Sequence, residues 1–185
     1  MASFDVTNLF TNVPLKETTE IILNNYNPTS FFNISKTILS KLLIFATSES
    51  IFIYKDRIFN QIDGVSMGCP LGPTYANIFM CHNEVKWLHD CPNNFKPICY
   101  KRYVDDTFLV FKESSHIKLF LNYLNSKHPK IKFTCEQETD GKLSFLDVDL
   151  IKSDSGAIST GVYRKSTFTG QSLSCESTHR AHIIQ

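Results

Sequence analysis

The chain has 185 residues, of which 42% are hydrophobic and 20% are charged, and this composition is typical of one globular domain with a substantial core. The formal net charge is +1, so the overall charge neither favours nor excludes a nucleic-acid partner. The longest unbroken apolar runs, such as residues 42–46, are far too short to span a membrane, and no two of the six cysteines have the C-x-x-C spacing of a zinc or redox motif.

The first predicted element is a short strand that carries an acidic residue. Phe4 and Val6 alternate with Asp5 in the stretch SFDVTNLFTN, so Asp5 points away from its apolar neighbours. A carboxylate in a half-buried strand is disfavoured unless it is paired or binds a metal ion. Asp5 is therefore a candidate metal ligand.

The next region predicts two helices and a hairpin, and plain packing is enough to explain it. The first helix covers residues 16–25. Two apolar runs, residues 51–54 and 58–62, predict the hairpin. The second helix has an apolar face with helical spacing, made of Ile34, Ile38, Leu42 and Phe45.

A segment rich in glycine and proline follows the hairpin. Residues 63–73 read DGVSMGCPLGP, which cannot be the interior of a helix or strand. Glycines let the backbone approach a flat or anionic ligand closely. Pro73 suits the first turn of a helix, and that helix has an apolar face made of Ala76, Phe79, Met80 and Trp87.

An acidic pair lies between two strand-like runs, residues 98–100 and 107–111. The stretch Tyr103-Val104-Asp105-Asp106 therefore predicts a hairpin with carboxylates at its tip. Two neighbouring carboxylates repel each other, and Mg²⁺ is one reason to keep them together because it prefers hard oxygen ligands. A solvated turn is the alternative, since aspartate favours turns in its own right.

A helix and a meander of strands are predicted after this hairpin. Strands are expected over residues 131–136, 146–150 and 158–164, with a turn at residues 140–141. Asp147 and Asp149 share one face of the second strand, where outward-facing polar residues are favoured over metal ligands. The apolar face of the helix is made of Ile117, Phe120, Leu121 and Leu124.

Six segments together resemble a known family. They occur in the order SFDVTNLFTNVPL, DGVSMGCPLGPTYANIFM, YKRYVDDTFLVF, LNSKHPKIKFTCE, LSFLDVDL and VYRKSTFTG. This order resembles the catalytic motifs A to E of reverse transcriptases and the stretch leading to the thumb, and it is most similar to Penelope-like retroelements. The resemblance implies an α+β fold: a polymerase palm whose antiparallel sheet has helices packed on one face and is followed by a β-meander.

The resemblance also implies an activity and its partners. Such an enzyme is an RNA-directed DNA polymerase that moves a nucleotide from a dNTP to the 3′-hydroxyl of a DNA primer on an RNA template. Two Mg²⁺ ions, or Mn²⁺ in their place, would be the cofactors. By position, Asp5 resembles the motif A metal ligand and Asp105 the motif C ligand. Asp106 matches the second motif C aspartate, with a less direct role, and neighbouring strand side chains do point opposite ways.

The remaining site residues also follow from the resemblance. Phe10 matches the aromatic gate that would exclude a ribose 2′-hydroxyl. Met67-Gly68 stands where many reverse transcriptases have Gln-Gly, which removes one polar contact to the nucleotide. Tyr103 opens the Tyr-x-Asp-Asp motif and is expected beside the nucleotide. Lys142 is the candidate proton donor to pyrophosphate, and Lys132 is the alternative.

The resemblance sets the expected extent of the domain. Residues 1–165 correspond to the palm, and residues 166–185 lead toward a thumb. We expect a fragment without fingers, in the nucleus or cytoplasm, with no signal peptide and no membrane partner. Two alternatives stay open: a catalytically dead or co-opted nucleic-acid-binding fragment, and an RNA-templated RNA polymerase. Phe10 argues against the RNA-templated RNA polymerase. The intact Asp5, Asp105 and Asp106 argue against a sequence that has been inactive for long.

Overall fold

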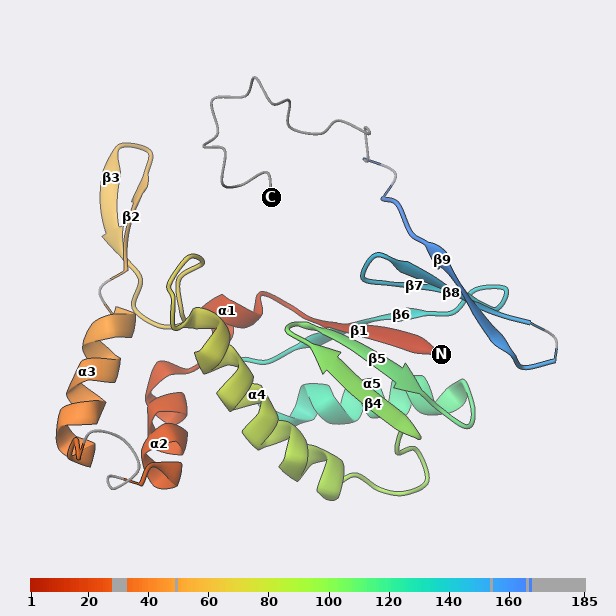
Figure 1. Cartoon of the computed structure of the whole chain (residues 1–185), viewed down its shortest axis with the longest axis horizontal. Coiled ribbons are helices and arrows are strands. Elements are labelled where there is room, and N and C mark those ends of the chain that lie inside the picture. The colour runs from red at the N-terminus through yellow and green to blue at the C-terminus, as the bar shows by residue number, and fades with distance from the viewer. Residues whose placement is uncertain (28–32, 49, 154, 166, 168–185) are drawn as a thin grey trace.

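A four-stranded antiparallel sheet lies at the centre of the computed structural model, in the order β4-β5-β1-β6 (Figure 1). Its strands are β1 (Ala2–Val6), β4 (Cys99–Tyr103), β5 (Asp106–Val110) and β6 (Phe133–Gln137). The structure describes residues 1–27, 33–48, 50–153, 155–165 and 167. The segment predicted to lead toward a thumb, residues 166–185, therefore lies outside the described residues except for residue 167.

Two long helices cover one face of this sheet: α4 (Gly72–His89) and α5 (Ser115–Lys127). The ring of Phe4 on β1 lies 6.2 Å from that of Phe120 on α5, and Trp87 of α4 lies 6.5 Å from Phe133 of β6. Because side chains alternate along a strand, Asp5 points to the opposite face. The predicted α+β class, with helices on one side of an antiparallel sheet, is confirmed.

Three further helices are α1 (Leu9–Asn12), α2 (Leu15–Asn25) and α3 (Lys36–Ser48). The helix α2, predicted over residues 16–25, is confirmed within one residue. Its Thr19 hydroxyl lies 3.3 Å from the buried hydroxyl of Tyr75 on α4, which joins the two helices inside the core. In the part of the chain that the structure describes, no helix is both long and apolar enough to cross a bilayer.

The apolar face predicted for α3 is wrong. Ile38, Leu42 and Phe45 are 54%, 52% and 69% exposed, and the helix instead buries Thr47 and packs Leu43 against the core. The following hairpin is also exposed along both of its strands, β2 (Ile51–Tyr54) and β3 (Arg57–Asn60). Plain packing therefore does not explain this region, because its apolar side chains lie on the surface.

The meander forms a second sheet of three strands, β7 (Lys142–Phe145), β8 (Val148–Lys152) and β9 (Ile158–Val162). The strand predicted over residues 146–150 forms two residues later, as β8, because Leu146 turns the chain with a φ of 54°, and β7 was not predicted. Asp149 is buried rather than outward-facing. It accepts a hydrogen bond from the Ser144 hydroxyl at 2.7 Å and forms an ion pair with Lys142 at 2.9 Å.

The predicted turn at Asp140-Gly141 forms, but it does not join two strands of one sheet. Both residues have positive φ, 51° and 73°, and a Cβ at Gly141 would lie 2.9 Å from the Lys152 carbonyl oxygen. Glycine is therefore required there. The strands on either side of this turn belong to different sheets, since β6 pairs with β1 and β7 pairs with β8.

The packing of Phe120 generates a stability prediction. Phe120 is fully buried, and its ring lies among those of Phe4, Phe111, Tyr100 and Tyr123. Replacing it with alanine should lower the free energy of unfolding by about 3–5 kcal/mol, because the lost contacts leave a cavity. Urea denaturation followed by circular dichroism measures this change.

The matched control is Phe52→Ala on the exposed hairpin. Phe52 is 50% exposed, so we expect a much smaller loss there. Equal losses in the two variants would contradict this description of the core.

Candidate active site at the tip of the β4–β5 hairpin

Carboxylates that are far apart in the sequence meet at one end of the central sheet. Asp5 lies directly opposite Asp106 in the β1–β5 register, and Asp105 lies in the turn that joins β4 to β5. The Val6 N–H donates to the Asp105 carbonyl oxygen at 3.0 Å, which ties the hairpin tip to β1. The fold therefore brings Asp5, Asp105 and Asp106 together.

The register also bears on Asp106. Residues directly opposite each other in an antiparallel pair project from the same face. Asp5 and Asp106 therefore share the face that α4 and α5 leave open, and Asp106 lies at least as directly beside Asp5 as Asp105 does. The smaller role expected for Asp106 stays a prediction.

Repulsion and desolvation act on two of these carboxyl groups. Partial desolvation and then the charge of Asp105 raise the pKa of Asp5. Partial desolvation, followed by the charges of Asp105 and Asp5, raises the pKa of Asp106 in spite of an opposing effect of Lys165. The ionised carboxylates are thus destabilised in the folded chain, and a cation held between them would relieve that cost.

The donor chemistry of this cluster fits Mg²⁺. The ion takes hard oxygen ligands and needs only one or two protein carboxylates, because waters and substrate phosphates supply the rest. Among the described residues, however, no three His, Cys, Asp or Glu side chains converge as a ready-made metal-binding group. The carboxylates of Asp5, Asp105 and Asp106 would therefore share such a site with oxygen atoms of the substrate.

The glycine- and proline-rich loop and α1 form a second part of the site. The carbonyl oxygen of Phe10 accepts the Val65 N–H at 2.7 Å. A Cβ at Gly64 would lie 2.2 Å from the Thr11 carbonyl oxygen, so the loop approaches α1 only because this residue is glycine. A pocket of about 230 Å³ lies between them and is lined by Phe10, Ser66, Met67, Gly68, Cys69, Pro70, Gly72 and Pro73.

The predicted nucleotide-binding residues thus lie in two groups. Phe10, Met67 and Gly68 line this pocket together, and Met67 is 78% exposed. Tyr103 is the last residue of β4, lies opposite Asp106 in the β4–β5 register and is also exposed.

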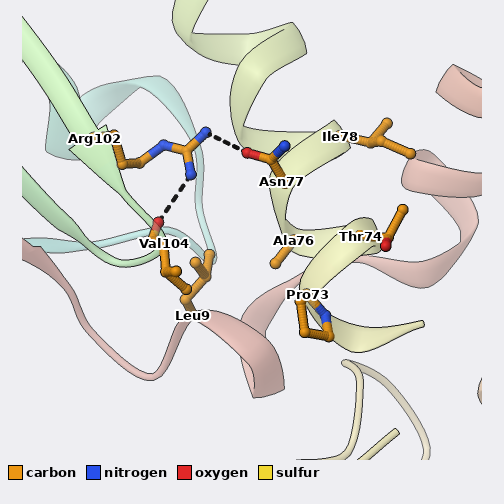
Figure 2. A pocket seen from close by; sticks show the side chains of 8 residues that line it. All are labelled: Leu9, Pro73, Thr74, Ala76, Asn77, Ile78, Arg102 and Val104. Carbon is orange, nitrogen blue, oxygen red and sulfur yellow. Dashed lines mark hydrogen bonds between the residues drawn. The ribbon is translucent and has the colours of Figure 1, made fainter. Parts of the chain in front are cut away.

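A larger pocket of about 360 Å³ lies beside the hairpin tip. Figure 2 shows its lining side chains, which come from α1, the first turns of α4 and the β4–β5 hairpin. They are Leu9, Pro73, Thr74, Ala76, Asn77, Ile78, Arg102 and Val104.

The two lysines predicted as candidate proton donors, Lys142 and Lys132, both have polar partners in the structure. The Lys142 ammonium group pairs with Asp149 inside the second sheet. The Lys132 ammonium group donates to the carbonyl oxygens of Asn125 and His128 at 2.7 and 3.2 Å, which caps the end of α5. Lys165, whose charge acts on Asp106, was not among the predicted site residues. The adjacent basic pair Arg164-Lys165 is the sequence signal that indicates it.

The chain belongs to the reverse transcriptase family. Residues 1–139 match the family described as reverse transcriptase (RNA-dependent DNA polymerase), and the match contains Asp5, Asp105 and Asp106. No curated protein matches the chain.

Two solved telomerases have a similar fold. Apo telomerase from Candida tropicalis, truncated from its C-terminal domain, has a TM-score of 0.58 and 15% identity over 88% of this chain. Telomerase from Candida albicans, in complex with a TWJ fragment of telomeric RNA, has a TM-score of 0.58 and 15% identity over 85%. The matched parts are 35% and 32% of those telomerase chains. This likeness is one of fold, and it confirms the predicted polymerase palm.

Removing one carboxylate should stabilise the metal-free chain at neutral pH. Because the folded-state pKa values of Asp5 and Asp106 are raised, the folded chain binds protons more readily than the unfolded chain. The stability that these two protonated carboxyl groups contribute to the fold is therefore fully present below the unfolded-state pKa of about 3.9. It is lost as the pH rises through their raised folded-state pKa values. Asp5→Asn and Asp106→Asn should each raise the melting temperature at pH 7, and the gain should vanish in acid.

Thermal melts between acidic and neutral pH, with a chelator present, measure this effect. Asp56→Asn makes the same chemical change on the exposed β2–β3 turn and serves as the control. A gain that is equal for Asp56→Asn, or that persists unchanged in acid, would show that repulsion at the tip is not its source.

Proposed function

We propose that this chain is the catalytic palm of a retroelement reverse transcriptase of the Penelope-like type. It extends a DNA primer on an RNA template with dNTPs, in the nucleus or cytoplasm. The observation that carries this proposal is the cluster of Asp5, Asp105 and Asp106 on the helix-free face of the sheet. Residues 1–165 would act as the palm, and residues 166–185 would lead toward a thumb.

The three carboxylates would hold two Mg²⁺ or Mn²⁺ ions at the hairpin tip. When bound, such ions activate the primer 3′-hydroxyl and stabilise the leaving pyrophosphate. The chain itself supplies a fixed arrangement of negative charge, because Asp5 and Asp106 project from paired positions of neighbouring strands. Phosphoryl transfer depends largely on such positioning and charge stabilisation.

Phe10 would act as the gate for the sugar of the incoming nucleotide. It is half-buried on α1 and lines the small pocket together with Met67 and Gly68. A ring fixed in this position leaves little room for a 2′-hydroxyl. Met67 offers an apolar contact to the nucleotide, and Tyr103 lies on the strand next to the carboxylates. Lys142 would have to leave its ion pair with Asp149 before it could donate a proton to pyrophosphate.

A catalytically inactive or co-opted nucleic-acid-binding protein is the second candidate. One observation favours it: within the described residues, no group of three His, Cys, Asp or Glu side chains is arranged so that it could hold a metal ion by itself. Binding of Mn²⁺ that depends on Asp5 discriminates between the two functions, because an inactive binding protein has no need of the metal.

The metal site generates the first functional prediction. In a reverse transcriptase that carries residues 1–165 as its palm, Asp5→Asn or Asp105→Asn should lower primer extension by roughly a thousandfold or more, since bound metal ions contribute several kcal/mol to the transition state. Asp106→Asn should lower it less. Single-turnover extension of a DNA primer on an RNA template is the measurement.

Asp56→Asn is again the control and should leave extension unchanged. Extension at the wild-type rate in either Asp5→Asn or Asp105→Asn would rule out the proposed metal site.

Phe10 generates the second functional prediction. Phe10→Ala should raise the ratio of ribonucleotide to deoxynucleotide incorporation by roughly tenfold or more, because the ring no longer excludes the 2′-hydroxyl. Competition between labelled rNTP and dNTP in the same extension assay measures the ratio. Phe108→Ala removes a ring that packs against Phe145 of the second sheet, outside the pocket lined by Phe10, and is the control. An unchanged ratio with activity retained would mean that Phe10 has only a packing role.

A further inference from the structure

Arg102 connects α4 to the tip of the acidic hairpin. Its Nη1 donates to the Val104 carbonyl oxygen at 2.9 Å, and its Nη2 donates to Asn77 Oδ1 at 3.2 Å, as Figure 2 shows. Its Nε donates to Glu84 Oε1 at 2.7 Å, and Nη2 also contacts the Cys81 sulfur at 3.3 Å. The guanidinium thus has one partner on the hairpin turn and three on a single face of α4.

The ion pair between Arg102 and Glu84 is buried. The Arg102 side chain is 7% exposed and that of Glu84 is 10% exposed, and Glu84 also accepts the Tyr100 hydroxyl at 2.6 Å. Desolvation makes a buried ion pair a weak source of net stability. Its fixed geometry is therefore the property that matters here, and the planar guanidinium fork is suited to hold several acceptors at once.

The turn that Arg102 contacts is strained. Val104 has a φ of 56°, in the left-handed region that a β-branched residue strongly disfavours. Such a conformation persists only where the surroundings hold it in place. The hydrogen bond from Arg102 to the Val104 carbonyl oxygen holds the peptide plane that leads directly into Asp105.

The peptide plane on the other side of Asp105 is held as well. The Asp105 carbonyl oxygen accepts the Val6 N–H at 3.0 Å, from the residue that follows Asp5 on β1. Asp105 is therefore fixed before and after its Cα, by α4 through Arg102 and by β1 through Val6. These two links together set its position relative to Asp5.

We propose that the Glu84–Arg102 ion pair is a positioning device that holds the Val104 turn and thereby sets the position of the Asp105 carboxylate for metal binding. The metal-binding part rests on the proposed function. The positioning part stands on the hydrogen bonds alone. Neither Arg102 nor Glu84 touches the substrate in this proposal, since both act through the backbone of the turn.

Amide hydrogen exchange of the 185-residue chain tests the positioning. Arg102→Lys keeps the charge, but an ammonium group cannot reach Glu84, Asn77 and the Val104 carbonyl together. Exchange at the Val6 N–H should become roughly tenfold faster, because its acceptor sits on the loosened turn. The neighbouring Thr7 N–H, which donates to the Lys132 carbonyl oxygen at 2.8 Å, should be unchanged and serves as the internal control.

Arg57→Lys makes the same substitution on the exposed strand β3 and should leave both amides unchanged. Glu84→Gln keeps the shape of the site, weakens the same link, and replaces Arg102→Lys if that variant does not fold. Unchanged exchange at Val6 overturns the positioning role. Equal acceleration at Val6 and Thr7 overturns it too, because that result indicates a general loss of stability.

Titration with Mn²⁺ alone, followed by the electron paramagnetic resonance of the free ion, tests the consequence for the metal. Arg102→Lys should weaken Mn²⁺ binding by roughly threefold or more, and Arg57→Lys should not weaken it. If Asp5→Asn leaves the binding of the otherwise unaltered chain unchanged, the proposed function fails while the exchange experiment still decides the positioning role. If binding depends on Asp5 but not on Arg102, the link from positioning to metal binding is wrong.

Discussion

The register between β1 and β5 is the constraint on which the rest of the site depends. It sets Asp5 opposite Asp106 and Phe4 opposite Thr107. A shift by one residue would move every side chain of β1 to the other face of the sheet. Phe4 would then leave the core beneath α5, and Asp5 would enter it without a partner. The packing of one apolar ring and the exposure of one carboxylate thus specify the same pairing.

That register imposes an electrostatic cost. Partial desolvation and the charge of Asp105 oppose the ionisation of Asp5 and of Asp106, and of these two carboxylates only Asp106 is eased by a positive charge, that of Lys165. The strained φ of Val104 adds to this cost at the same point. A fold selected for stability alone has no use for either feature, whereas a site that binds cations requires the first. Conflicts of this kind are expected at functional sites.

Much of this arrangement could be predicted from the sequence, for physical reasons that differ between elements. Helices α4 and α5 have apolar residues at helical spacing, and these residues pack on the central sheet. Both helices were therefore predicted with the faces that they bury. The meeting of Asp5 and Asp105 followed from the resemblance, because residues one hundred positions apart are joined only by the fold. The buried face of α3 was predicted wrongly, since periodicity shows that a helix is amphipathic but not which surface covers it.

Other features gave no signal in the sequence. Leu146 at positive φ has none of the residue preferences that indicate a turn, so β7 and the turn that follows it were missed. The burial of Asp149 depends on Lys142 and Ser144, which only the hairpin brings beside it. Arg102 is, in the sequence, only a basic residue before the acidic motif. Its role depends on three residues of α4 that contact its guanidinium.

The exposed hairpin has a consequence for the behaviour of the chain in solution. Among the described residues, β2 and β3 pair only with each other, so the outer edge of each strand presents unpaired backbone N–H and C=O groups. Both strands are also rich in isoleucine and phenylalanine. An open, apolar strand edge is a template for pairing with another chain. Lys55, Asp56 and Arg57 place charge only at the turn, so strand-to-strand association through this hairpin is a route by which concentrated protein would aggregate.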